Sequence, residues 1–183
     1  MEIIRTRTNK PPRILIHADH GIGKSSLAAA APSPIFVQLE DGLENIDTQA
    51  FPRCSSFDDM LEQLTWLYRE KHEFKTLVLD SLDWAEMLIA QHVCKEGNKK
   101  SISDFSYGAG YQAVLENFNR VIKAVSAIRE SRGMAVIAIC HSQIKTYANP
   151  MGADYDRHCL KLRDKNAELW MEWCDLIGFM HFS

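Results

Sequence analysis

The chain has 183 residues, of which 46% are hydrophobic and 25% charged, and its formal net charge is −3. This balance is typical of a globular domain and excludes intrinsic disorder. We expect residues 1–183 to form a single domain that begins with a tail at residues 1–12. Because the net charge is slightly negative, any nucleic-acid site must be a local basic patch.

Neither the apolar runs nor the cysteines indicate secretion or membrane insertion. No run approaches the roughly 18 apolar residues of a membrane helix, and the N-terminal stretch lacks the apolar core of a signal peptide. The five cysteines show neither a disulfide framework nor the spacing of a zinc site. We therefore expect a cytoplasmic protein without a membrane partner.

Apolar runs and helical periodicities alternate along the chain. In chain order they predict a strand at 13–17, a helix at 24–31, a strand at 35–39, a helix at 57–70, a strand at 76–80, a helix at 82–94, a surface loop at 95–107, a helix at 109–131, a strand at 134–140, an excursion without clear periodicity at 142–164, a helix at 166–173 and a strand at 175–182. This alternation predicts an α/β fold with a mostly parallel central sheet flanked by helices. The sequence leaves open whether residues 176–182 form an edge strand or whether a C-terminal portion is missing.

A phosphate-binding pattern directly follows the first predicted strand. Residues 18–25, with the sequence ADHGIGKS, match GxxxxGK[ST] except that Ala18 replaces the first glycine. Glycines let successive backbone N–H groups wrap a phosphate, Lys24 would reach the β- and γ-phosphates, and Ser25 would hold Mg²⁺. Position 18 lies at the strand exit, where a positive φ is not required. The residues expected to surround the phosphates are Gly21, Ile22, Gly23, Lys24, Ser25 and Ser26.

Two carboxylates end later predicted strands. Asp80 is expected to hold Mg²⁺ opposite Ser25, and the alternative is an N-cap of the following helix. Glu40 is expected to orient or deprotonate the attacking water, and the alternative is a turn carboxylate. Ligand sites gather at the carboxyl ends of parallel strands, so Lys24, Glu40 and Asp80 form the predicted catalytic set.

Polar side chains also follow the most apolar predicted strand. His141 and Gln143 stand where a side chain can sense the γ-phosphate and move the loop that follows. Polar capping of the strand end explains the same residues equally well.

Together these residues resemble the core of RecA-type ATPases. The resemblance rests on the phosphate loop and on the segments LEDGL at 39–43, LVLDS at 77–81 and ICHSQI at 139–144. In that family the catalytic glutamate ends the strand after the phosphate-loop helix, which is the position of Glu40. Ordinary AAA+ proteins carry the glutamate beside the strand-ending aspartate, where this chain has Ser81.

The compact length is similar to that of phage-encoded, core-only RecA-like ATPases that anneal single-stranded DNA. The resemblance implies ATP and Mg²⁺ binding, self-association into a ring or filament, and DNA binding by loops after the fourth strand, in a bacterial host cytoplasm. The basic residues expected to contact DNA or a neighbouring subunit's ATP are Lys145, Arg157, Lys161, Arg163 and Lys165. By composition alone, the same segment is a solvated loop of mixed charge.

The sequence thus predicts a slow, DNA-linked ATPase of phage-type recombination, annealing or repair. One alternative is a small-molecule kinase with a lid at 95–107 that carries Lys95, Lys99 and Lys100. The other is a non-hydrolysing ATP switch, such as a helicase-loader-like partner. The tryptophans at 66, 84, 170 and 173 lie at helical spacings and are expected in the core rather than in a base-stacking surface.

Overall fold

The computed structural model describes residues 10–182, so residues 1–9 of the predicted tail lie outside the described residues. The elements in chain order are β1 (Arg13–Ala18), α1 (Lys24–Ala29), β2 (Pro34–Gln38), β3 (Gln49–Ala50), α2 (Phe57–Arg69), β4 (Thr76–Asp80), α3 (Leu82–Glu96), η1 (Ile102–Asp104), η2 (Ser106–Gly108), α4 (Ala109–Arg132), β5 (Ala135–Tyr147), β6 (Tyr155–Leu160), α5 (Asp164–Trp173) and β7 (Leu176–Phe179). Within residues 10–182, no helix combines the length and apolarity needed to span a bilayer.

The strands form one sheet in the order β3-β2-β4-β5-β1-β7, with every neighbouring pair parallel. The predicted α/β fold with a parallel sheet is confirmed. Parallel pairing brings the carboxyl ends of β1, β2, β4 and β5 to one edge of the sheet. The loops that leave these strands therefore meet there.

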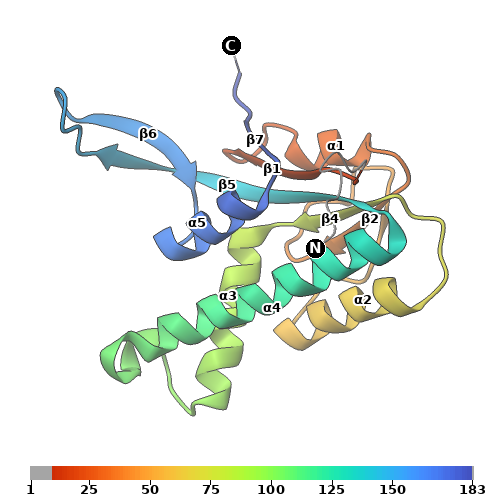
Figure 1. The fold of residues 1–183 in the computed structure, drawn as a ribbon, viewed down its shortest axis with the longest axis horizontal. Helices are drawn as coiled ribbons and strands as arrows, with labels where there is room; N and C mark the ends of the chain where they lie inside the picture. Colours follow the sequence, from red (N-terminus) through yellow and green to blue (C-terminus); the bar gives the residue numbers. More distant parts are fainter. Residues whose placement is uncertain (1–9, 183) are drawn as a thin grey trace, which may run out of the picture.

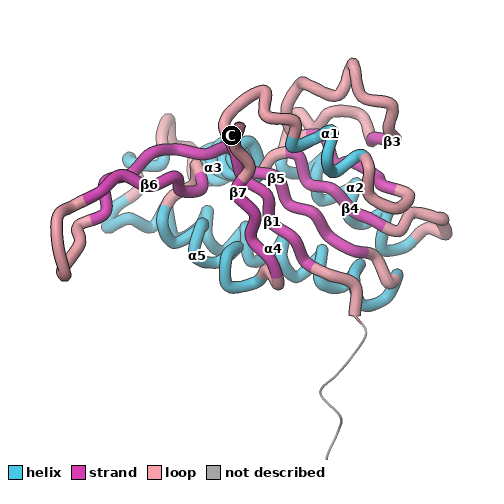
Figure 2. Tube along the Cα trace, turned by 90° about the horizontal axis from the view of Figure 1, so that it is seen from above, coloured by secondary structure: helices cyan, strands magenta, loops and turns pink. Residues whose placement is uncertain are grey.

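Alternating side chains of the strands face two separate apolar layers. Leu77 and Leu79 of β4 pack with buried residues of α2, α3, α4 and α5, whereas Val78 faces α1 and packs with Ala28. Figure 2 shows α1 on one side of the strands and the longer helices on the other. The inner strands are buried on both faces, which explains why their sequences are continuous apolar runs rather than alternating ones.

The main departure from the predicted elements is a β-hairpin. β5 continues past the apolar run to Tyr147 and pairs antiparallel with β6, so the region 142–164 is largely regular. The hairpin projects from the sheet (Figure 1). Its strands carry exposed side chains on both faces, Ile144 among them, and such strands lack the alternation that reveals a half-buried strand.

Two smaller differences concern exposure and the sheet edge. Trp170 is fully buried as expected, but Trp66 and Trp84 are 41% and 38% exposed, so the core prediction was wrong for these two. Helical spacing identifies a shared face but not whether another element covers it. β7 pairs with β1, so Leu176–Phe179 form the predicted last strand, at one end of the described sheet.

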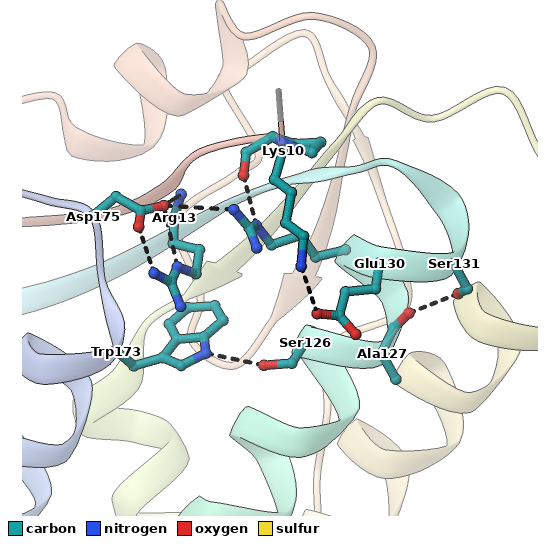
Figure 3. A network of polar contacts seen from close by, with 10 residues as sticks. Lys10, Arg13, Ser126, Ala127, Glu130, Ser131, Trp173 and Asp175 are labelled. Atoms are coloured by element: carbon teal, nitrogen blue, oxygen red, sulfur yellow. Dashed lines mark hydrogen bonds and ion pairs between the residues drawn. The ribbon is translucent and has the colours of Figure 1, made fainter. Parts of the chain in front are cut away.

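A polar network fixes β7 beside β1 (Figure 3). The guanidinium of Arg13 donates two hydrogen bonds to Asp175, of 2.5 Å and 3.1 Å, and the Arg13 backbone N–H donates a third. The hydrogen bonds from Arg13 lower the pKa of Asp175 to about 2. Trp173 Nε1 donates to Ser126 Oγ at 3.0 Å, which attaches the end of α5 to α4. The start of β1 is thus held in place, and β1 leads directly into the phosphate loop.

Candidate functional site

The loop between β1 and α1 has the backbone that the phosphate-binding pattern requires. Gly21 and Gly23 have φ values of +75° and +95°, which L-residues with a side chain rarely adopt. Ala18 is still part of β1, pairs with His141 of β5, and is not among the described residues with positive φ. An alanine therefore fits the first position of the pattern without strain. Ile22 is half-buried and Ser26 is exposed on α1, both within the loop region as predicted.

Lys24 is buried within its own loop. Its Nζ donates hydrogen bonds to the backbone oxygens of Asp19, at 2.8 Å, and Ala18, at 3.2 Å. Burial lowers its pKa, and the nearby Glu40 and Asp80 carboxylates oppose that shift. A bound phosphate would offer this ammonium a charged partner in place of two carbonyl groups.

Ser25 and Asp80 meet as the sequence predicted. Ser25 Oγ donates to Asp80 Oδ2 at 2.6 Å, and Asp80 Oδ1 is buried without a hydrogen-bond partner among the described residues. Burial raises the pKa of Asp80, while the Ser25 hydrogen bond and the charge of Lys24 oppose the rise. A hard cation with oxygen ligands would satisfy the unpartnered oxygen. The pair therefore fits Mg²⁺, with Ser25 Oγ and Asp80 as the residues that would hold it.

Glu40 also lies at this edge of the sheet. The Leu39 backbone N–H donates to the Asp80 carbonyl at 2.7 Å, which holds the end of β2 beside the end of β4. Burial raises the pKa of Glu40; its neighbour His141 opposes this, and the Asp80 and Asp83 carboxylates add to it. A largely buried carboxylate of raised basicity can accept a proton from water.

His141 lies between two carboxylates. Its Nε2 is 3.8 Å from Glu40 Oε1, and its Nδ1 is 3.0 Å from Asp83 Oδ2. Burial alone would raise the pKa of Asp83, but hydrogen bonds from His141 outweigh it and lower that pKa. His20 of the phosphate loop stacks on His141, with ring centroids 3.8 Å apart. His141 therefore contacts three parts of the site at once.

Asp83 and His20 are site residues that the sequence reasoning missed. Asp83 and His141 are 58 positions apart, and only the packing of α3 against β5 brings them together. The sequence did contain one signal for Asp83, which is its position in the first turn of the helix that follows Asp80. An acidic residue at that position faces back towards the strand ends.

Gln143 has a different place from His141. Its Nε2 donates to the backbone oxygens of Leu160, at 2.7 Å, and Leu162, at 3.2 Å. It thus ties β5 to the end of β6 at the base of the hairpin. The structure brings His141, but not Gln143, into contact with the phosphate loop.

A groove of about 1330 Å³ opens beside the histidine pair. It runs between the start of α3, the start of α4, the base of the hairpin and α5, and we call it the basic groove. Its lining includes four of the five predicted basic contacts, Lys145, Lys161, Arg163 and Lys165. The fifth, Arg157, lies away from this lining, with its guanidinium 4.6 Å from the ring centre of Tyr147.

Aromatic side chains complete the basic groove. Trp84 and Tyr111 line it, and the guanidinium of Arg163 lies 3.4 Å from the ring centre of Tyr111. Tyr107 is fully exposed at the groove, on a backbone with φ +51°. His20 and Asp83 line the end of the groove that faces the phosphate loop. Cations and flat rings therefore share one surface that ends at the two residues in contact with His141.

Comparison with known proteins agrees with this geometry. The sequence matches the AAA domain family over residues 10–183. The chain belongs to the AAA domain family. Its fold is similar to the crystal structure of the RadB recombinase, with a TM-score of 0.53 and 15% sequence identity over 92% of this chain and 74% of that chain. The resemblance to RecA-like P-loop ATPases is confirmed at the level of the fold.

A sequence relative adds a phage context. The chain is 25% identical over 173 residues to the SPbeta prophage-derived uncharacterized protein YorG of Bacillus subtilis (strain 168). The match includes 81% of this chain and 54% of that protein, so the chain spans about half the length of its relative. The similarity to phage-encoded RecA-like proteins agrees with this match.

Proposed function

We propose that this AAA domain protein hydrolyses ATP with Mg²⁺ and uses the nucleotide to control binding of single-stranded DNA in phage-type recombination, annealing or repair. The observation that carries the proposal is that the basic groove lies next to the residues around Glu40. His20 and Asp83 line the basic groove and both contact His141, which lies 3.8 Å from Glu40. The basic groove is thus connected to Glu40 through His141.

At the phosphate loop, each predicted residue has a distinct task. Lys24 and the backbone N–H groups of residues 21–25 would bind the phosphates, and Ser25 and Asp80 would hold Mg²⁺, which would neutralise phosphate charge. Glu40 orients the attacking water and accepts its proton. His141 positions the Glu40 carboxylate, because Asp83 fixes the imidazole from its other side.

The basic groove suits a single strand better than a duplex. Single-strand sites combine cations that follow the phosphates with aromatic rings on which bases stack. Arg163, Lys161 and Lys165 supply the cations, and Trp84 and Tyr107 supply exposed rings. A net charge of −3 is compatible with this site because the groove lining has a small local excess of basic side chains, four against the carboxylates Asp83, Glu86 and Asp164.

The two regions are connected through the backbone as well. The Lys161 N–H donates to the His141 carbonyl at 2.8 Å, so the end of β6 is fixed to the residue beside Glu40. A nucleotide that moves His20 or His141 would shift Lys161 and the groove wall. This connection supports coupling between nucleotide and DNA.

Self-association is part of the proposal. The projecting hairpin carries exposed apolar side chains, Ile144 at 65% and Met151 at 92%. Exposed apolar residues on a projecting element are typical of protein contacts. Repetition of small basic grooves along an assembly would increase the avidity for one DNA strand.

The kinase alternative has less support from the geometry. Its proposed lid lysines, Lys95, Lys99 and Lys100, are not among the residues that line the basic groove. Phe105 instead packs that segment against Gly97 and Gly110, at the ends of α3 and α4. A packed segment is a poor lid.

The test is ATP turnover by the purified chain with and without oligothymidylate, with both products identified. We expect ADP and inorganic phosphate, a rate that rises with DNA, and loss of turnover in Lys24→Ala. Transfer of phosphate to a small molecule would favour the kinase. ATP binding with DNA control but unchanged behaviour in Glu40→Gln would favour the non-hydrolysing switch.

A further inference from the structure

The end of the molecule that contains β3 and α2 carries an exposed group of rings. Trp66 of α2 lies edge-on to Phe51, with ring centroids 5.5 Å apart, and stacks on His72, with ring centroids 5.9 Å apart. The ring centroid of Phe74 is 5.4 Å from that of His72. We call these four residues the aromatic cluster. Trp66 is 41% exposed within it, and large exposed rings that gather at one place indicate a contact surface.

Two buried polar atoms at the same end have no hydrogen-bond partner among the described residues. They are Nδ1 of His72 and Oγ1 of Thr48, the residue directly before β3. β3 itself is exposed and lies at one end of the described sheet. Buried polar groups in folded proteins are nearly always paired, so these two atoms are a second, independent sign of a contact surface here.

The hairpin of β5 and β6 lies at the opposite end of the molecule. Both views along the shared long axis show the hairpin at the left and α2 at the right, with β3 beside α2 (Figures 1 and 2). A two-stranded hairpin has little stability of its own, and in this one Met151 is 92% and Tyr155 49% exposed. Because the two ends of one chain are far apart, the hairpin can meet an aromatic cluster only in a second copy.

The two ends also differ in charge. Residues 41–75, which include β3, α2 and the aromatic cluster, contain eight acidic and four basic side chains. Residues 141–165, which include the hairpin and its base, contain five basic and three acidic side chains. Opposite charge favours contact between unlike ends, whereas like charge disfavours contact between two identical ends. A head-to-tail arrangement of copies is therefore favoured.

We infer that the hairpin of one copy docks on the aromatic cluster of the next, with Met151 and Tyr155 packed against Trp66. The contact joins two different surfaces, so each copy can bind one neighbour at each end, and the copies form a ring or a filament. The inference deepens the self-association in the proposed function and rests on it. The base of each hairpin lines the basic groove, so the grooves of successive copies would follow one another along the assembly.

The test is sedimentation velocity over a range of protein concentrations, without nucleotide and again with a non-hydrolysable ATP analogue and Mg²⁺. The hairpin variant carries Met151→Ser together with Tyr155→Ser, and the cluster variant carries Trp66→Ser. We expect each variant to weaken self-association about 10- to 100-fold. Met171→Ser is the matched control, because it replaces an apolar side chain that is 39% exposed on α5, outside both surfaces, and it should leave self-association unchanged.

A mixture of the hairpin variant and the cluster variant gives the sharpest result. The hairpin variant keeps an intact aromatic cluster and the cluster variant keeps an intact hairpin, so equal amounts should form dimers of one copy each and no larger species. Absence of these dimers would overturn the inference. So would an unmodified protein that stays monomeric with and without the analogue.

A second variant tests the same end without altering its packing. Glu70→Lys together with Glu73→Lys changes only exposed side chains, and we expect it to weaken self-association about 3- to 10-fold. Unchanged self-association in this variant and in Trp66→Ser would exclude the aromatic cluster as the docking surface. Calorimetry with ATP and Mg²⁺ tests the proposed function separately. A monomeric protein that binds ATP overturns the docking alone, whereas an assembly that binds no ATP overturns the nucleotide site alone.

Discussion

The phosphate loop and the basic groove meet at His20 and Asp83 but are built in opposite ways. Lys24 and Asp80 are 6% and 3% exposed, and both side chains are oriented by hydrogen bonds or ion contacts with their neighbours. In the groove, Tyr107 is fully exposed and Trp84 is 38% exposed. Buried polar groups hold one geometry, whereas exposed cations and rings adapt and are screened by salt. Under the proposed function, the rigid loop would suit chemistry and the adaptable groove would suit a variable polyanion.

Removal of Lys24 should have the largest effect. Lys24→Ala removes the lysine of the phosphate loop, which would contact the phosphates, so kcat/KM for ATP should fall by at least about 10³-fold. Steady-state turnover measures this. Lys24→Ala should still bind DNA in the absence of nucleotide. Loss of that binding would mean that the groove depends on the phosphate loop for its structure.

Glu40→Gln should separate binding from turnover within the loop. The amide keeps the size of the side chain but cannot accept a proton, so kcat should fall by about 10²-fold with ATP affinity nearly unchanged. Single-turnover hydrolysis together with nucleotide titration measures both quantities. Full turnover in this variant would remove Glu40 from the mechanism.

Arg163→Ala should affect the groove alone. The variant loses one cation, which stacks on Tyr111, so DNA binding should weaken about 5- to 30-fold. The slope of the logarithm of the binding constant against the logarithm of the salt concentration should fall by about one, the value for one phosphate contact. Turnover without DNA should not change. Arg69→Ala is the matched control, since Arg69 is exposed at the end of α2 and outside the groove. If Arg163→Ala and Arg69→Ala weakened DNA binding equally, the groove would not be the DNA site.

The smallest effect should come from Asp175, remote from both regions. Its pKa of about 2 is below the ordinary 3.8, so the ion pair with Arg13 stabilises the folded chain above about pH 4 and loses its effect as the pH falls towards 2. Because the pair is partly exposed, Asp175→Asn should lower the free energy of unfolding by about 1 kcal/mol at pH 7. Urea unfolding of the two proteins should converge in acid. A constant difference at all pH values would exclude the carboxylate charge as the cause.

The sequence was sufficient for the parallel strands β1, β2, β4, β5 and β7 and for the place of most phosphate-loop residues, but β3 and β6 were not predicted. Continuous apolar runs located β1, β2, β4 and β5, because central parallel strands are buried on both faces. The meeting of Ser25 with Asp80 followed from the same pattern, since the phosphate loop leaves the carboxyl end of β1 and Asp80 is the last residue of β4, at the same edge of the sheet.

Features that depend on distant packing were not predictable. Asp83 becomes a site residue only when α3 packs beside β5. The hairpin was missed because neither face is covered, so its residues carry no apolar alternation. Trp84 has core-like spacing, yet the groove leaves it exposed.

The central claim is that nucleotide at the loop controls DNA in the groove. It is tested most directly by fluorescence anisotropy of a labelled oligothymidylate, titrated with and without a non-hydrolysable ATP analogue and Mg²⁺. The account predicts that the analogue tightens DNA binding about tenfold in the unmodified protein and has no effect in Lys24→Ala. The same DNA affinity with and without the analogue, or no DNA binding at low salt, would contradict it.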